Sequence, residues 1–446
     1  MMLQRKILNT FRQWKEEKTS ECLLVKGARQ VGKTFAIRQF GQESYESVVE
    51  LNFIESPRLK SAFDEELSPQ EIRKRITLLL PGASFVPGRT LLFLDEIQEC
   101  PNARTALKFL AEDSSVDVVA SGSLLGISYS EVSSIPVGYE RQIEMSGLDF
   151  EEFLWAVGYS EEAVRAIRGH LANFEPFPAD IHETLLGKLR EYLAVGGMPA
   201  VVSAFVRENS FATAFTEQEM ILNAYLDDIA KYATPRDRNK ARDCYLSIPR
   251  QLAKENTKFR YGVVEKKGSA RKFETALDWL RDANLIRYCR SVTTASFPLR
   301  AYEDEQRFRV YLSDPGLLCA MYGFDMMAAI VEDKLQGPMK GGLYENLVAD
   351  MLAKAGFDLH YWMNDKGNIE IEFLLEHDAS VVPVEVKAKK GATASLNTFL
   401  ERDDISRGYK LSAGNIGVSG KKITLPLYAG AFLRDIIAVQ PLPKQD

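Results

Sequence analysis

Four residues at the spacing GxxxxGK[ST] constrain this chain more than any other feature. Gly27, Gly32, Lys33 and Thr34 have this spacing, and the apolar run 23–25 directly precedes them. Glycines let the backbone turn so closely that successive N–H groups can point at one anion. A helix that begins near Lys33 would add the positive end of its dipole. The pattern therefore predicts a buried strand, a phosphate-binding loop and a helix, in that order.

The chemistry of this loop, a Walker A pattern, favours a nucleoside triphosphate with magnesium. Lys33 can place a positive charge beside the β- and γ-phosphates, and Thr34 can offer its hydroxyl to Mg²⁺. We expect the nucleotide to be ATP. The predicted ATP-binding residues are Gly27, Ala28, Arg29, Gln30, Val31, Gly32, Lys33, Thr34 and Phe35.

A second apolar run, 91–94, ends in two carboxylates. Asp95 is placed to bind Mg²⁺ directly or through water, and Glu96 to activate the attacking water as a general base. A later apolar run ends at Ser121 and Ser123, which we predict as sensors of the γ-phosphate; a simple turn is the alternative. The combination predicts hydrolysis in addition to binding.

An arginine usually stabilises the transition state of such a reaction. Arg29, Arg104 and Arg141 are candidates by their position in the sequence. A neighbouring subunit could also supply this group, because active sites of this type often form between subunits. The sequence does not choose among these sources, and it leaves open both a monomer and a homo-oligomer.

Strands and helices alternate through the first part of the chain. We expect strands at 23–25, 48–53, 90–95 and 116–121, separated by helical patterns. Such alternation predicts an α/β fold with a parallel sheet and helices on both faces. From about residue 149 the pattern becomes helical, and residues 236–300 then show short helices followed by a hairpin, the outline of a winged helix.

Charge is distributed unevenly along the chain. The net charge of −6 excludes a uniformly basic nucleic-acid coat, but residues 236–290 contain 15 Lys and Arg against seven Asp and Glu. This local excess predicts an anionic partner, with DNA as the candidate. Solvated helix faces, or packing of this segment on the ATPase domain, remain alternatives. The cations that could contact phosphates are Arg250, Lys254, Lys258, Arg260, Lys266, Lys267, Arg271 and Lys272.

Five scattered cysteines and four isolated histidines give no disulfide framework and no zinc pattern. We expect reduced thiols. No apolar run approaches the ~18 residues of a membrane span, and residues 1–16 lack the core of a signal peptide. The sequence therefore predicts a cytoplasmic protein without a membrane partner.

Several longer motifs together resemble the prokaryotic AAA-type (AAA+ or STAND-like) P-loop ATPases that have a C-terminal domain of unknown function 4143. The motifs are GARQVGKT at 27–34, LLFLDEIQECP at 91–101, ASGSLLG at 120–126, IPVGYERQIEMSGLDFEEFL at 135–154, YLAVGGMPAVV at 192–202, IPRQLAKENTKF at 248–259, YLSDPGLLCAMYG at 311–323, YEN at 344–346 and VPVEVKAKK at 382–390. The resemblance implies ATP binding and hydrolysis, a winged helix and a tail with a restriction-endonuclease-like fold.

Four domains are expected on these grounds. They are an AAA-type P-loop ATPase domain at 1–160, a helical lid or linker at 161–235, a winged helix at 236–330 and an α/β PD-(D/E)XK nuclease-like domain at 331–446.

The tail also has acids at nuclease-like positions. Residues i and i+2 of a strand face the same side, so Glu385 and Lys387 should point together, with Glu372 on the next strand and Glu345 on a helix. The usual second-strand acid is Asp, and Glu372 departs from that pattern. Octahedral Mg²⁺ tolerates such a shift poorly. A nuclease-like fold used for binding or only as structure is therefore the alternative to an active nuclease.

The sequence favours Mg²⁺-dependent ATP hydrolysis that drives a conformational switch or motor, which could act on DNA. One alternative is an ATP-regulated DNA nuclease that uses the tail. Another is a non-hydrolysing nucleotide-binding scaffold.

Overall fold

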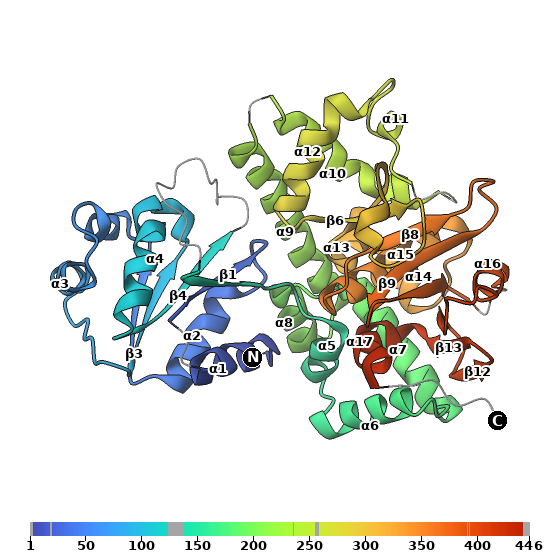
Figure 1. Ribbon diagram of the computed structural model, residues 1–446, viewed down its shortest axis with the longest axis horizontal. Helices are drawn as coiled ribbons and strands as arrows, with labels where there is room; N and C mark the ends of the chain where they lie inside the picture. The colour runs from blue at the N-terminus through green and yellow to red at the C-terminus, as the bar shows by residue number, and fades with distance from the viewer. Residues whose placement is uncertain are drawn as a thin grey trace. The chain divides into compact units, whose positions relative to one another are not determined.

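The computed structural model describes residues 3–17, 20–123, 138–234, 236–254, 258–389, 391 and 393–439. The chain divides into two units (Figure 1). The N-terminal unit comprises residues 4–147 together with 282–284, and the C-terminal unit comprises the rest of the described chain.

In the N-terminal unit, helices alternate with strands as the sequence predicts. The elements are α1 (Ile7–Glu17), β1 (Cys22–Gly27), α2 (Lys33–Ser44), β2 (Ser47–Asn52), α3 (Pro69–Leu79), β3 (Thr90–Asp95), α4 (Pro101–Asp113), β4 (Asp117–Ser123) and β5 (Glu140–Glu144), with 3₁₀ turns η1 (Pro57–Phe63) and η2 (Ile97–Glu99).

The five strands form one sheet in the order β2-β3-β4-β1-β5, and every pair is parallel. This confirms the predicted α/β fold with a parallel sheet. Ligands of such sheets bind at the carboxyl ends of the strands. Because β4 lies between β1 and β3, the predicted phosphate loop and the predicted acids flank the end of β4.

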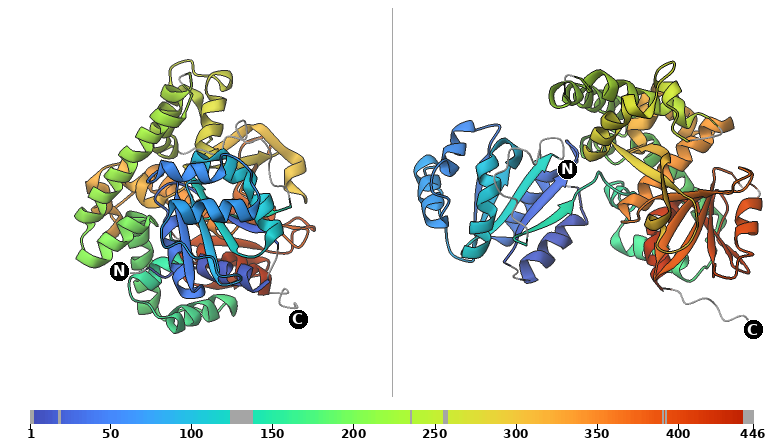
Figure 2. Two further views of the ribbon diagram at one scale, coloured as in Figure 1. Left: turned by 90° about the vertical axis from the view of Figure 1, so that its left-hand side faces the viewer. Right: turned by 45° about the horizontal axis from the view of Figure 1, so that its top comes forward.

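Helices cover both faces of this sheet, and Figure 2 shows the strands lying side by side between them. On one face, Leu24, Leu92 and Leu94 pack with Ile76 of α3 and Leu107 of α4. On the other face, α2 packs closely enough that the side chains of Val48 and Leu91 lie against Gly41. All six residues of β3 are buried. Each buried Leu or Phe contributes roughly 1.5–3 kcal/mol, so the strand ends are held on a rigid support.

The N-terminal unit ends at residue 147 in the main run of the chain, and the predicted domain boundary at residue 160 stays a prediction. Helix α5 (Phe150–Ala156) belongs to the C-terminal unit. The rings of Phe150 and Phe153 lie 5.6 and 5.3 Å from the ring of Tyr192, and the Leu148 N–H donates to the Gly197 carbonyl over 2.6 Å. These contacts place α5 in the C-terminal unit.

The C-terminal unit begins with helices and ends in a mixed sheet. Its further elements are α6 (Glu161–Ala172), α7 (Ala179–Val195), α8 (Pro199–Glu208), α9 (Phe211–Tyr232), α10 (Arg238–Leu252), α11 (Tyr261–Val264), α12 (Ala270–Asp282), β6 (Ile286–Val292), β7 (Glu303–Leu312), α13 (Pro315–Met321), α14 (Phe324–Val331), α15 (Gly337–Lys354), β8 (His360–Met363), β9 (Glu370–His377), β10 (Ser380–Lys387), α16 (Ala394–Phe399), β11 (Gly408–Ser412), β12 (Gly417–Ser419), β13 (Lys422–Pro426) and α17 (Leu433–Val439).

Eight strands of this unit form one sheet in the order β12-β13-β11-β10-β9-β8-β6-β7. The hairpin β6–β7 is antiparallel, as expected after the helices α10 to α12. However, β6 also pairs in parallel with β8, so the sheet continues across the predicted domain boundary at residue 330. The segments 161–235, 236–330 and 331–446 lie in one unit, and their division into a lid, a winged helix and a nuclease-like domain stays a prediction.

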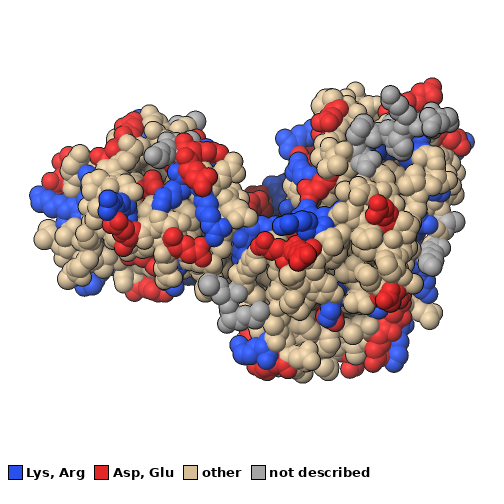
Figure 3. Space-filling model, turned by 90° about the horizontal axis from the view of Figure 1, so that it is seen from below, with Lys and Arg blue, Asp and Glu red and all other residues tan. Residues whose placement is uncertain are grey.

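None of the helices within the described residues is both long and apolar enough to cross a bilayer. All five cysteines are buried and free. On the face drawn in Figure 3, Lys and Arg lie among Asp and Glu, in keeping with the small net charge.

Candidate functional site

The carboxyl ends of β3 and β4 and the start of α2 converge on Asp95. The Thr34 hydroxyl lies 3.2 and 3.1 Å from the two carboxylate oxygens of Asp95. The Ser121 hydroxyl donates to the same carboxylate, and the Asn52 side-chain amide donates to it over 3.0 Å. Asp95 itself is 1% exposed. Three of these four residues were predicted to share the site, and the structure brings them into direct contact.

Helix α2 begins as an anion site requires. Gly32 precedes it in the left-handed region, at φ 93°, where a side chain would be strained. Among the described residues no side chain caps this helix. Its first N–H groups therefore remain available to an anion, together with the positive end of the helix dipole.

Lys33 folds back over the loop that precedes it. Its ammonium donates to the carbonyls of Gly27 and Ala28 over 3.0 and 2.9 Å, and the residue is 7% exposed. Burial lowers the pKa of Lys33 to about 8, which the carboxylates of Glu96 and Asp95 partly oppose. A triphosphate in the loop would restore the charged form of this lysine.

The back of the loop is held by the segment after β5. A Cβ on Gly27 would lie 2.2 Å from the Met145 carbonyl oxygen, so only glycine fits there. The Met145 N–H donates to the Lys26 carbonyl over 2.7 Å. Arg5, 8% exposed, joins the two segments, because its guanidinium donates to the Val31 carbonyl over 3.1 Å and to the Ser146 carbonyl over 2.6 Å.

Glu96 is held in an unusual conformation beside Asp95. Its φ of 56° lies in the left-handed region, which costs a non-glycine residue about 1–2 kcal/mol. Its carboxylate accepts from the Gln98 amide over 2.6 Å, and its N–H lies 3.4 Å from the Ser121 hydroxyl. Burial raises the pKa of Asp95, the hydrogen bonds from Ser121 and Thr34 oppose this, and the charge of Glu96 adds to it.

The remaining predicted loop residues have mixed environments. Ala28 and Val31 are buried, and Arg29 is half-buried. Gln30 has φ 65°, and Phe35 is 53% exposed although it is a large apolar residue. Ser123 ends β4, but its side chain lies outside the described part of the structure, as do parts of the motifs at 120–126 and 135–154.

Two of the candidate arginines, Arg104 and Arg141, form ion pairs away from the phosphate loop. Arg104 is 3% exposed and lies 2.7 Å from Glu140. Arg141 lies 2.6 Å from Glu17 and 3.0 Å from Glu21. Arg29 is the candidate that lies on the phosphate loop itself, and it influences the charge state of Lys33.

Sequence reasoning missed Arg5, Asn52 and Gln98. Asn52 ends β2, and its place beside Asp95 follows from the register of β2 and β3. Knowledge of the strand order would have identified it. Gln98 lies only two residues after Glu96, so an amide next to a predicted base was the available signal. The sequence gives no signal for the role of Arg5, because this residue is distant in sequence from the loop that it contacts.

The C-terminal acids that were predicted as nuclease-like form ion pairs with lysine and arginine side chains. Lys387 lies 2.8 Å from Glu372 and 2.9 Å from Glu385. Glu345 instead pairs with Arg309 over 2.7 Å. Burial raises the pKa of Glu372 to about 7 against the opposing charge of Lys387. Among the described residues no group of three or more His, Cys, Asp or Glu is arranged to hold a metal ion.

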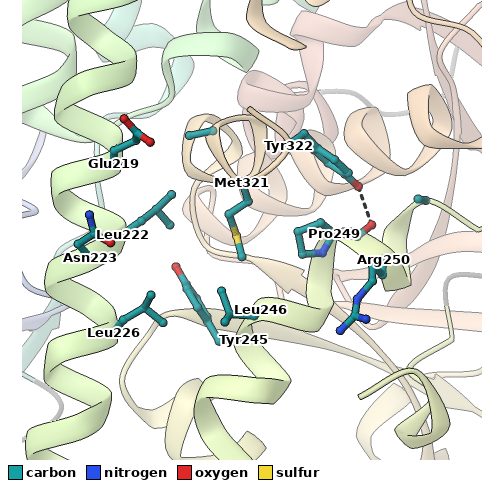
Figure 4. A pocket seen from close by; sticks show the side chains of 12 residues that line it. Glu219, Leu222, Asn223, Leu226, Tyr245, Leu246, Pro249, Arg250, Met321 and Tyr322 are labelled. Atoms are coloured by element: carbon teal, nitrogen blue, oxygen red, sulfur yellow. Dashed lines mark hydrogen bonds between the residues drawn. The ribbon is translucent and has the colours of Figure 1, made fainter. Parts of the chain in front are cut away.

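A separate cavity of about 520 Å³ lies among α9, α10 and the end of α13. Figure 4 shows Leu222 and Leu226 of α9 on one side and Leu246 of α10 on the other. The Tyr322 hydroxyl donates to the Pro249 carbonyl over 2.6 Å at its edge. None of the predicted nucleotide-binding residues lines this cavity.

Comparison with known families matches three parts of the chain. Residues 19–154 match the family described as AAA domain, and residues 340–429 match a domain of unknown function, DUF4143. Residues 186–328 match another domain of unknown function, DUF8612. Among curated proteins no match is found.

Three solved structures illustrate the similarity at low identity. The Walker-type ATPase of Pyrococcus abyssi is 15% identical, with 72% of this chain and 96% of that chain covered and a TM-score of 0.42. The Aeropyrum pernix ORC1 protein in complex with DNA is 13% identical, with 75% and 95% covered and a TM-score of 0.30. A STAND protein with a tetratricopeptide repeat sensor from Pyrococcus horikoshii is 14% identical, with 80% and 46% covered and a TM-score of 0.26.

The AAA and DUF4143 matches lie in the order that the sequence motifs imply. The AAA match contains the phosphate loop, β3 and β4, and the DUF4143 match contains the strands β8 to β13. The chain therefore combines a region that matches the AAA domain family with a C-terminal region that matches the domain of unknown function 4143.

Proposed function

We propose that this chain binds ATP with Mg²⁺ at residues 27–34 and hydrolyses it. The observation that supports this most is the contact of Thr34 with Asp95, which places a hydroxyl and a carboxylate together at the end of a helix with open N–H groups. Hydroxyl and carboxylate oxygens are the ligands that Mg²⁺ takes beside phosphates.

Each residue has a distinct role in this proposal. The loop N–H groups and Lys33 hold the phosphates, and Thr34 and Asp95 would hold the magnesium. Bound Mg²⁺ supplies positive charge that stabilises the transferring phosphoryl group. Glu96 accepts a proton from the attacking water, while Gln98 positions its carboxylate and Ser121 that of Asp95.

Turnover of ATP by the purified protein, with Mg²⁺ and with EDTA, tests the proposal. We expect Mg²⁺-dependent phosphate release that is absent from the Lys33→Ala variant. Binding without turnover in the wild-type protein would instead support a nucleotide-binding scaffold, and failure to bind any nucleotide would contradict both.

Because Lys33 is buried, ATP binding should be coupled to the uptake of a proton by its side chain. With a pKa of about 8 in the free protein, Lys33 is largely neutral at pH 9, whereas beside a triphosphate it is charged. ATP binding at pH 9 should therefore take up close to one proton, and affinity should fall as the pH rises through 8. Calorimetry in buffers of different ionisation enthalpy measures this uptake. It should disappear in Lys33→Arg, because that side chain is charged throughout.

We propose that ATP turnover drives a conformational switch or motor that acts on DNA. The support is the row of exposed cations on and around α10 and α12, which includes Lys266, Lys267 and Arg271. Phe259 is only 4% exposed, so it belongs to the core and does not offer a base-stacking surface. The proposal predicts backbone-directed binding and ATP turnover that rises when DNA is added.

Removal of three exposed cations tests the DNA contact. The variant Lys266→Gln/Lys267→Gln/Arg271→Gln should bind DNA more weakly than the wild type. The slope of log K against log salt concentration should become shallower by about 0.9 for each lost phosphate contact. Fluorescence anisotropy from low to moderate salt measures both quantities. A control that removes two lysines of the N-terminal unit, Lys74→Gln/Lys60→Gln, should leave the salt slope unchanged. An unaltered slope in the triple variant would exclude this segment as the DNA contact.

We further propose that a second subunit can supply the transition-state arginine. Arg104 and Arg141 are engaged by Glu140, Glu17 and Glu21, which favours a source outside these two residues, either Arg29 on the phosphate loop or an arginine from another copy. Mass in solution with and without ATP distinguishes the two sources, since only the second requires assembly.

A further inference from the structure

Four glutamates of the C-terminal unit, three on strands of its sheet and one on α15, are divided between two cations. Lys387 of β10 pairs with Glu372 of β9 and Glu385 of β10 over 2.8 and 2.9 Å. Arg309 of β7 pairs with Glu345 of α15 over 2.7 Å and also contacts Glu370 of β9. Each cation thus bridges two carboxylates.

Arg309 is fixed in this position by its surroundings. Its side chain is 4% exposed, and its guanidinium lies 4.3 Å from the centre of the Tyr361 ring. The Tyr311 hydroxyl, two residues along the same strand, donates to the same Glu345 oxygen that Arg309 contacts. A buried arginine with two carboxylates and an aromatic face is held by directional contacts and cannot simply swing into solvent.

These residues do not fit a nuclease-like metal centre. Such a centre needs carboxylate oxygens that converge on one position and are free of competing cations. Here Glu345 is shared by a guanidinium and a tyrosine hydroxyl, and one oxygen of Glu385 is taken by Lys387 while the other accepts from the Leu396 N–H over 3.3 Å. A dication at this point would also stand beside two positive side chains.

We infer that Arg309 is a resident cation of this acidic cluster and that, together with Lys387, it occupies the carboxylates that a divalent metal would need. The cluster is then an ion-pair network that joins the hairpin β6–β7 to α15 and β9. Arg309 comes from the segment predicted as a winged helix. Three of the four glutamates of the cluster come from the strands of the predicted nuclease-like domain. The inference is independent of the ATPase proposal, since none of its residues belongs to the phosphate site.

Manganese binding to the full chain without nucleotide tests this inference. We expect wild-type protein and the Glu385→Gln variant to bind Mn²⁺ identically, because the cluster has no metal site to lose. Neither should cleave plasmid DNA in Mg²⁺ or Mn²⁺, and EDTA should not lower the unfolding midpoint. A Mn²⁺ site in the wild type that disappears in Glu385→Gln, or cleavage that disappears in Lys387→Ala, would overturn the inference.

A second measurement tests Arg309 as the cation. Arg309→Met should lower the unfolding midpoint by roughly 5–10 °C, because it leaves Glu345 and Glu370 without their cation. The double variant Arg309→Met/Glu345→Gln should regain part of that loss. If Arg309→Met does not fold, the double variant and Arg309→Lys supply the comparison. If the double variant is no more stable than Arg309→Met, no such network exists. The same conclusion follows if the losses from the two single substitutions simply add in the double variant.

Discussion

Replacement of Glu96 by Gln is expected to lower the rate of ATP hydrolysis by ~10²–10⁴-fold, the usual contribution of a general base. Glutamine keeps the size of the side chain and its ability to accept from Gln98, which lies 2.6 Å away. It cannot take a proton from water. The Kd for ATP should therefore stay nearly unchanged, because Lys33 and the loop N–H groups are intact. Steady-state phosphate release and nucleotide fluorescence measure the two quantities separately.

Glu99→Gln provides the matched control for this loss. It makes the same chemical change three residues further along, on a partly exposed side chain that pairs with Lys60 over 3.6 Å. Its turnover should equal that of the wild type. If Glu96→Gln hydrolyses ATP at the wild-type rate, Glu96 is not the base. If it loses ATP binding as well, the residue acts on the loop and not on the water.

The parts of the site that the sequence predicts are those encoded by local pattern. Lys33 and Thr34 follow a strand and open a helix, and Asp95 ends an apolar strand, so each position depends on a few neighbouring residues. Ser121 was predicted only as one of two sensor candidates. Its hydrogen bond to Asp95 follows from the insertion of β4 between β1 and β3, and strand order is not a local property.

Contacts that depend on distant segments were outside the reach of sequence patterns. Arg5 holds the phosphate loop through carbonyls of Val31 and Ser146, and a lone arginine in a polar N-terminal segment gives no sign of that. The same holds for Arg309. The spacing of Glu385 and Lys387 correctly suggested a shared face, but nothing in it indicated that an arginine from an earlier strand would pair with Glu345.

A buried ion pair in the C-terminal unit leads to the largest stability effect that we expect. Lys354 of α15 lies 2.6 Å from Asp350, and the two side chains are 4% and 0% exposed. The ammonium also donates to the Leu148 carbonyl over 3.0 Å and to the Tyr192 hydroxyl over 3.1 Å. Lys354→Met keeps the length of the side chain but leaves the buried carboxylate of Asp350 with only the longer contact to Arg287, at 3.7 Å. The free energy of unfolding should fall by about 3–5 kcal/mol.

Chemical denaturation monitored by circular dichroism measures this loss of stability. Two further variants serve as comparisons. Lys334→Met removes a lysine that is 71% exposed and pairs with the neighbouring surface residue Glu332, so it should cost less than about 0.5 kcal/mol. Asp350→Asn/Lys354→Met removes both charges and should cost less than Lys354→Met alone, because the penalty arises from the buried carboxylate that has lost its nearer cation. Equal losses in the single and double variants would place the energy in the hydrogen bonds to Leu148 and Tyr192. Lys354 would then stabilise the fold by hydrogen bonds that connect α15 to the start of the C-terminal unit, and its charge would contribute little.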